Sequence, residues 1–221
     1  TTESGSGLTD AVTEGTSQLR LWSGVFGYEY SKRSGNALTG EGLRRLRRNW
    51  GQMLSHAVSP QPHSALEVGA NIGRNLMALS GLIPQLHAVE PNLKCCEEMR
   101  VNPQLTGVNL YQGDAFSLPY EDGVIDLVFT SGVLIHIAPE DLLKATNEIV
   151  RVARHYVLCI EYFSHDPTSV AYRHLGEGYL LKRDFGGWYL DHYPELKVVD
   201  YGFLWERVDA GDDLNWWLFK K

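Results

Sequence analysis

The sequence lacks a long hydrophobic segment and has few cysteines. No apolar run approaches the roughly 20 residues that a membrane-spanning helix needs. The N-terminus lacks the regions of a signal peptide, and Cys95, Cys96 and Cys159 have no metal-ligand spacing. An odd number of thiols is typical of a reducing compartment. We therefore expect a cytoplasmic protein with structural thiols, without a membrane segment or a metal site.

Positive charge is also scarce. The chain has 20 lysines and arginines against 27 acids, a net charge of −7. Phosphate binding needs a basic face, so this balance excludes nucleic acid as a general partner. One basic cluster spans 44–48, within a helix expected over 40–56. Its spacing turns Leu43, Leu46 and Trp50 inward and leaves the arginines as a solvated face.

The composition predicts one domain with aromatic ends. A chain of 221 residues with 43% hydrophobic residues can bury one sizeable core. Residues 1–18 are polar and are expected to form a flexible tail, so the domain spans 19–221. Aromatic residues gather near both ends of the domain. We expect lid elements at about 19–56 and 163–192 that fold over a pocket, and the glycines within 19–35 exclude a long helix there.

The middle of the chain alternates between strand and helix patterns, which is typical of an α/β fold. We expect a seven-stranded, mostly parallel sheet with an antiparallel C-terminal hairpin. The expected strands are 64–68, 85–90, 107–111, 124–130, 154–162, 196–204 and 214–219. The expected helices, besides 40–56, are 73–81, 92–101, 139–151 and 177–192.

The most informative segment is 66–73, Leu-Glu-Val-Gly-Ala-Asn-Ile-Gly, together with Glu90 at the end of the next strand. A strand breaks into a glycine turn, a helix follows, and a second strand ends in an acid. Doubly wound α/β domains use this layout to hold an adenosine-containing cofactor. Glu90 is placed to accept hydrogen bonds from both ribose hydroxyls.

The loop itself favours one class of cofactor. A dinucleotide site needs a middle glycine facing a pyrophosphate, and here Asn71 stands between Gly69 and Gly73. Glu67 would repel a pyrophosphate but suits a cation, and S-adenosylmethionine carries a sulfonium and an ammonium. The alternative is that the two glycines only allow tight packing between strand and helix.

Two later strand ends extend this site. Asp114 is placed to accept from the adenine amine, with the Ala115 backbone at a ring nitrogen and Phe116 over the base; the alternative is an Asp that forms a turn. Backbone carbonyls at 130–131 can receive the cofactor's ammonium. Asp126, in the strand before them, either orients loop groups or caps the start of the strand.

Candidate residues for the chemistry and for an acceptor come from the rest of the chain. His136 lies where an acceptor would approach and can take a proton near neutral pH, although a lone histidine is often structural. Tyr162 ends the fifth strand on the same rim. Positive charges at Arg173, Lys182 and Arg183 suit an acidic substrate, or salt bridges that hold a lid. Arg33 is a candidate clamp for the cofactor's carboxylate.

With these residues in place, the chain from about residue 22 to residue 221 resembles class I S-adenosylmethionine-dependent methyltransferases. More narrowly, it resembles the pseudaminic-acid-biosynthesis-associated methylase group, through runs at 22–30, 67–76, 132–137, 161–162, 182–185 and 200–203. The resemblance implies that the cofactor lies among Glu67, Gly69, Asn71, Gly73, Glu90 and Asp114. We extend this expected cofactor site to Trp22, Tyr28, Arg33, Asn75, Pro91, Ala115, Phe116 and Ser131.

The leading hypothesis is methyl transfer to a small, polar, acidic acceptor, a sugar or natural-product intermediate. His136, Tyr162 and Tyr30 are the expected catalytic residues, and Tyr172, Arg173, Lys182 and Arg183 the expected substrate contacts. One alternative keeps the fold and the cofactor: an enzyme that cyclises S-adenosylmethionine to azetidine-2-carboxylate and methylthioadenosine, instead of leaving S-adenosylhomocysteine. A second alternative is a non-catalytic cofactor-binding partner. The protein is expected to be a monomer or a dimer.

Overall fold

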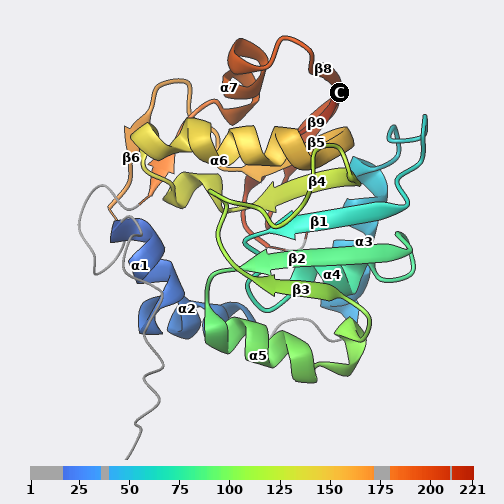
Figure 1. Ribbon diagram of the computed structural model, residues 1–221, viewed down its shortest axis with the longest axis vertical. Helices are drawn as coiled ribbons and strands as arrows, with labels where there is room; N and C mark the ends of the chain where they lie inside the picture. The colour runs from blue at the N-terminus through green and yellow to red at the C-terminus, as the bar shows by residue number, and fades with distance from the viewer. Residues whose placement is uncertain (1–16, 36–39, 172–179, 210) are drawn as a thin grey trace, which may run out of the picture.

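A seven-stranded sheet forms the centre of the computed structural model, which describes residues 17–35, 40–171, 180–209 and 211–221 (Figure 1). The strand order is β3-β2-β1-β4-β5-β9-β8. Five strands are parallel: β1 (Ser64–Val68), β2 (Gln85–Glu90), β3 (Asn109–Gln112), β4 (Ile125–Ser131) and β5 (Ala153–Glu161). The hairpin β8 (Lys197–Leu204) and β9 (Leu214–Lys220) is antiparallel, so the predicted α/β fold is confirmed.

Helices cover both faces of the sheet. In Figure 1, α6 (Pro139–Val152) lies in front of the sheet, while α3 (Glu41–Met53) and α4 (Arg74–Leu79) lie behind it. Helix α5 (Leu93–Val101) contacts β2 and β3, and α7 (Phe185–His192) contacts β5. Each face therefore has its own hydrophobic cluster, and the sheet is buried between them.

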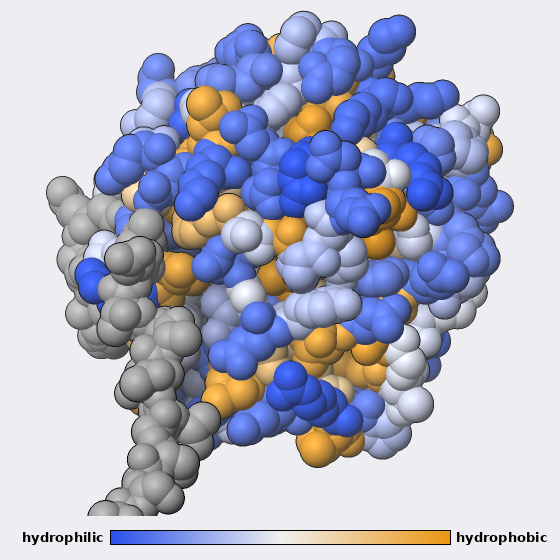
Figure 2. Space-filling model, viewed as in Figure 1, coloured by the Kyte–Doolittle hydropathy of each residue, from blue (hydrophilic) through white to orange (hydrophobic). Residues whose placement is uncertain are grey.

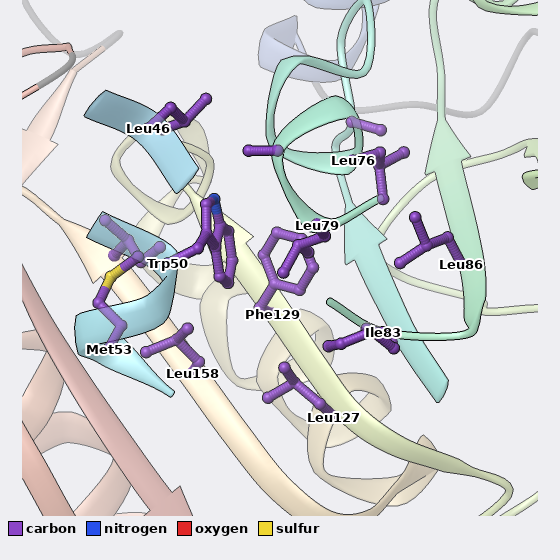
Figure 3. Close-up of a cluster of buried hydrophobic side chains, with 14 of the residues drawn as sticks. Leu46, Trp50, Met53, Leu76, Leu79, Ile83, Leu86, Leu127, Phe129 and Leu158 are labelled. Atoms are coloured by element: carbon purple, nitrogen blue, oxygen red, sulfur yellow. The ribbon is translucent and has the colours of Figure 1, made fainter. Parts of the chain in front are cut away.

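The cluster behind the sheet depends on aromatic side chains from α3 and β4. The rings of Trp50 and Phe129 pack edge to face with centroids 4.7 Å apart, and both side chains are fully buried (Figure 3). Leu46, on the same side of α3, is buried as well. Arg45, next to it, pairs with Glu41 outside the core. The prediction that the basic cluster is a solvated face is confirmed.

Local signals set the starts of two helices. Helix α6 begins with Pro139, whose missing N–H costs nothing in the first turn. Helix α5 begins after Asn92, whose side chain accepts from the backbone N–H groups of Lys94 and Cys95. The three cysteines are free and buried, in agreement with structural thiols.

The N-terminal segment is more helical than expected. It forms α1 (Ser17–Ser23) and α2 (Val25–Gly35), and α1 begins two residues inside the expected tail. Gly24 separates the two helices, so the exclusion of one long helix is confirmed. Helix α3 ends at Met53, three residues before the expected end at His56.

The helix expected over 177–192 is wrong in its first part. Residues 177–179 lie outside the described residues, and Leu181–Lys182 form a short strand, β7, that pairs with β6 (Thr168–Ser169). Helix α7 begins only at Phe185, because the Asp184 side chain accepts from the Gly187 N–H and caps it. Two 3-10 turns, η1 (Pro103–Leu105) and η2 (Leu134–His136), were not anticipated.

The surface seen in Figure 2 is largely hydrophilic, with hydrophobic residues in small separate groups. None of the described helices is both long and apolar enough to cross a membrane. Within the same residues, no cluster of three histidine, cysteine or acidic side chains is arranged to hold a metal ion.

Asp126 is a structural link at the amino ends of the strands. Its Oδ2 accepts from the backbone N–H groups of His63 (2.9 Å) and Ser64 (3.2 Å), and its Oδ1 accepts from Arg154 (3.2 Å). Of the two roles considered for Asp126, the structure supports the capping role. The loop groups of the opposite rim are not among its partners.

We expect Asp126→Ala to lower the free energy of unfolding by about 2–4 kcal/mol, because two backbone N–H groups lose their acceptor. Asp122→Ala is the matched control, since Asp122 is exposed and its ion pair with Arg151 contributes at most about 1 kcal/mol. Urea unfolding measures both changes. Equal stability of the two variants would contradict the assignment.

Candidate functional site

A cavity of about 320 Å³ lies at the carboxyl ends of the parallel strands. Strand β1 pairs with both β2 and β4, so the strand order reverses beside it, and ligands of open α/β sheets bind at such a point. Helices α1 and α2 and the β8–β9 turn complete the walls. The predicted residues that line the cavity are Trp22, Tyr30, Glu67, Gly69, Asn71, Asn75, Glu90, Pro91, Asp114, Ala115, Phe116, Ser131, His136 and Tyr162.

Two features require glycine at position 69: a positive φ angle and the close approach of Val133. Its φ is 77°, and a Cβ atom there would lie 2.6 Å from Cγ2 of Val133. The turn after β1 therefore packs directly against the segment after β4. Asn71 also has positive φ (53°), which asparagine tolerates better than most residues.

Gly73 has a different role from the one expected. It does not line the cavity, and a Cβ atom there would lie 2.6 Å from Leu105 Cδ1 and 3.1 Å from Met99 Sδ. The packing interpretation accounts for Gly73, whereas Gly69 both packs against Val133 and lines the cavity. Its positive φ (78°) lets the chain enter α4 while contacting α5 and η1.

Glu90 joins the loops after β1 and β2. Its two carboxylate oxygens accept the backbone N–H groups of Asn71 (2.7 Å) and Asn92 (2.9 Å). Burial raises the pKa of Glu90 to about 7, although both N–H groups favour the charged form. Each oxygen keeps a second lone pair, so the side chain can still accept from a vicinal diol such as a ribose.

Glu67 is buried, and one of its two carboxylate oxygens has no partner among the described residues. Its Oε1 accepts from Asn75 Nδ2 (2.7 Å), and Asn75 Oδ1 accepts from Trp50 Nε1 (3.3 Å). Its Oε2 is buried and has no hydrogen-bond partner among the described residues. Burial raises the pKa of Glu67 to about 8, and the nearby charge of Glu90 adds to the shift. A buried oxygen of this kind is suited to a cationic ligand.

The structure shows the turn-forming role considered for Asp114, and the adenine contact stays a prediction. Its Oδ1 accepts from the Phe116 N–H (2.8 Å), which forms the turn, and the same three residues, 114–116, line the cavity. The turn therefore presents the Phe116 ring to the cavity. Lys144 Nζ lies 5.6 Å from the centroid of that ring.

His136 belongs to an aromatic group that closes one side of the cavity. Its ring lies 4.2 Å from that of Trp22, and Trp22 packs edge to face on Tyr30 at 5.2 Å. Helices α1 and α2 thus bring lid residues against η2. No pattern in the sequence indicates which lid residue meets His136.

Glu161 holds the segment that carries His136. It is fully buried at the end of β5, and one of its oxygens, Oε1, accepts the N–H groups of Val133 and Leu134 at 2.8 Å each. Burial raises its pKa to about 7. Its position at a strand end on the same rim was the available signal, but the contact with the segment after β4 could not be anticipated.

Tyr162 is paired with a residue that sequence reasoning missed. Its hydroxyl donates to Oδ2 of Asp212, in the β8–β9 turn, at 2.6 Å. Burial, reinforced by Asp212, raises the pKa of Tyr162 above its usual value. Tyr162 is therefore a neutral donor near pH 7. The lining residues not among the predicted site include Arg74, Asn92, Cys95, Gly211 and Asp212.

Three predicted ligand contacts point elsewhere. Tyr28 does not line the cavity, because its hydroxyl donates to Glu98 on α5 (2.7 Å). Lys182 lies over the ring of Tyr162 (4.8 Å), and Arg183 over the ring of Trp188 (4.2 Å).

Neither Lys182 nor Arg183 lines the cavity, and neither forms an ion pair within the described part of the chain. Cation–π contacts replace the salt bridges considered for them. Tyr172, Arg173 and the side chain of Arg33 lie outside the described residues.

Part of the chain is similar in sequence to known methyltransferases. Residues 66–160 match the model of a family described as a methyltransferase domain. The uncharacterized methyltransferase YcgJ of Bacillus subtilis is 28% identical over 124 residues, which are 53% of this chain and 48% of that protein. The match therefore spans about half the length of that relative.

Solved structures share the fold at low identity. An S-adenosylmethionine-dependent methyltransferase from Aquifex aeolicus has a TM-score of 0.63 at 16% identity, covering 87% of this chain and 97% of the other. The 1,6-didemethyltoxoflavin-N1-methyltransferase of Burkholderia thailandensis has a TM-score of 0.66 at 15% identity, covering 96% and 93%. The family match supports a methyltransferase domain over residues 66–160, and the solved structures show that the chain shares the fold of S-adenosylmethionine-dependent methyltransferases.

Proposed function

We propose that the protein is an S-adenosylmethionine-dependent methyltransferase that acts on a small, polar, acidic acceptor, a sugar or natural-product intermediate. The observation that carries the proposal is Glu67, a buried carboxylate with an unpartnered oxygen, in the same cavity as Glu90 and Asp114. Three acids around one cavity oppose a pyrophosphate. They suit a ligand that combines a sulfonium, an ammonium and a ribose.

In this proposal, different residues of the cavity contact different parts of the cofactor. The turn of Asp114 and Phe116 would hold the adenine, and Glu90 would accept from the ribose hydroxyls. Gly69 keeps the backbone open beside the methionyl part, and Glu67 with the Ser131 carbonyl would face its positive charges. When bound, the sulfonium supplies an electrophilic methyl group.

The chain's own contribution to catalysis is orientation and proton removal. The lids exclude water and align the acceptor with the methyl group. His136 is the proton acceptor in this proposal, because its ring lies in the cavity wall against Trp22. Tyr162 is poorly placed to act as a base, because its pKa is raised and its hydroxyl proton is donated to Asp212; its oxygen can still accept a hydrogen bond from the acceptor. Tyr30 lines the acceptor side from α2.

Cyclisation of the cofactor is intramolecular and needs no second substrate. A cyclase would therefore have the space beyond the methyl group filled by tyrosine side chains. Of the four candidate tyrosines, Tyr30 and Tyr162 line the cavity, Tyr28 faces α5, and Tyr172 lies outside the described residues. The three described tyrosines favour a pocket with room for a second substrate.

Incubation of the purified protein with S-adenosylmethionine alone, followed by mass spectrometry, separates these reactions. We expect the protein to break down S-adenosylmethionine no faster than the cofactor decomposes without it. Methylthioadenosine with azetidine-2-carboxylate would assign a cyclase instead, and a protein that binds no S-adenosylmethionine or S-adenosylhomocysteine would contradict both.

We expect Glu90→Ala to weaken S-adenosylmethionine binding about 100-fold, because two hydrogen bonds to a carboxylate are lost. Gly69→Val should abolish binding, since its Cβ would overlap Val133. Gly51→Val is the control, because Gly51 is exposed on α3 with no atom near its Cβ position. Calorimetry measures the affinities and melting temperature checks the fold; full binding by both site variants would contradict the assignment.

The protonation of Glu67 should make the affinity for the cofactor depend on pH. With a pKa of about 8, Glu67 is mostly protonated at pH 7 in the free protein, whereas a cation favours its charged form. Binding should release a proton, and affinity should rise from pH 6 to about 8 by at most about tenfold per pH unit.

The matched control is Glu67→Gln, in which this rise should vanish. The ratio of the wild-type and Glu67→Gln affinities cancels the titration of the cofactor's own amine. Calorimetry in buffers of different ionisation enthalpy measures the proton release. A ratio that stays constant with pH would show that Glu67 does not meet the cation.

A further inference from the structure

Arg74 is a cation in the cavity wall that forms no ion pair with any residue the structure describes. It is the first residue of α4, is half-buried, and lines the cavity. Its Nε is buried with no hydrogen-bond partner among the described residues. Buried guanidinium groups are normally paired, because removing the charge from water is costly.

Several other arginines of the described chain are neutralised by an acid or stacked on a ring. Arg45, Arg151 and Arg154 pair with Glu41, Glu148 and Asp126, and Arg183 lies over Trp188. Arg74 forms no ion pair with a described residue. Among the described lysines and arginines, Arg74 is the one that lines the cavity.

Arg74 shares the cavity wall with Asp212, Tyr30 and Glu67. Burial lowers the pKa of Arg74, and these three groups oppose that shift. Asp212 and Tyr30 come from the β8–β9 turn and α2, the walls that close over the strand ends.

We propose that Arg74 binds a carboxylate of the acceptor and so selects acidic acceptors. This inference rests on the proposed methyl transfer. A guanidinium matches a carboxylate with two parallel hydrogen bonds, which a neutral analogue cannot accept in the same way. Arg74 thus takes the role that the sequence suggested for Lys182 and Arg183, whose side chains stack on aromatic rings instead.

A carboxylate is also present in the cofactor, so the first measurement separates the two sources. Calorimetry gives the affinities of S-adenosylhomocysteine and methylthioadenosine, which lacks the amino acid part, for the wild type and Arg74→Gln. We expect both affinities to change less than about threefold. A tenfold or larger loss for S-adenosylhomocysteine alone would assign Arg74 to the cofactor and overturn the proposal. Arg47→Gln, on the exposed side of α3, is the matched control.

The second measurement uses protein saturated with S-adenosylhomocysteine and two matched probe pairs, glucuronate with glucose and benzoate with benzamide. We expect the wild type and Arg47→Gln to bind at least one acid about tenfold more tightly than its neutral mate. Arg74→Gln should lose this preference and Arg74→Lys should keep part of it.

Equal binding of acids and neutral mates by the wild type, or an unchanged preference in Arg74→Gln, would overturn the proposal. Failure of S-adenosylhomocysteine to bind the wild type would instead contradict the methyltransferase function itself. The two failures are therefore distinguishable.

Discussion

Buried carboxylates at the carboxyl ends of β2 and β5 hold the cavity together. Glu90 accepts backbone N–H groups from the turns after β1 and β2, and Glu161 accepts two from the segment after β4. These N–H groups would otherwise be left without partners in a water-poor site, which is costly. The carboxylates thus fix the loops that carry Asn71 and His136, and every wall contributed by those loops depends on them.

The same burial determines the electrostatics of the site. Glu67, Glu90 and Glu161 all have raised pKa values, because low polarity disfavours their charged forms. A cation placed among them reverses that effect. Arg74 is in the complementary situation, because this half-buried positive charge has no anion of the described chain within ion-pair distance. The cavity therefore offers acidic groups to a cation and a guanidinium to an anion.

The lids add side chains that the strand ends do not supply. Trp22 and Tyr30 reach the cavity from α1 and α2, and Asp212 reaches Tyr162 from the β8–β9 turn. Tyr28 belongs to the same aromatic run as Tyr30 but faces α5. A helix separates neighbouring positions by about 100° around its axis, so only part of such a run can face the cavity.

The sequence by itself determined the sheet, the glycine turn after β1 and the acids at the strand ends. These features arise from local hydrophobic pattern and backbone conformation, and parallel strands bring their carboxyl ends to one rim. Only the tertiary structure decided which charges reach the cavity. Arg74 and Asp212 line it, whereas Lys182 and Arg183 lie over aromatic rings. The direction of a long side chain depends on packing partners distant in the chain, and a local pattern contains no information about them.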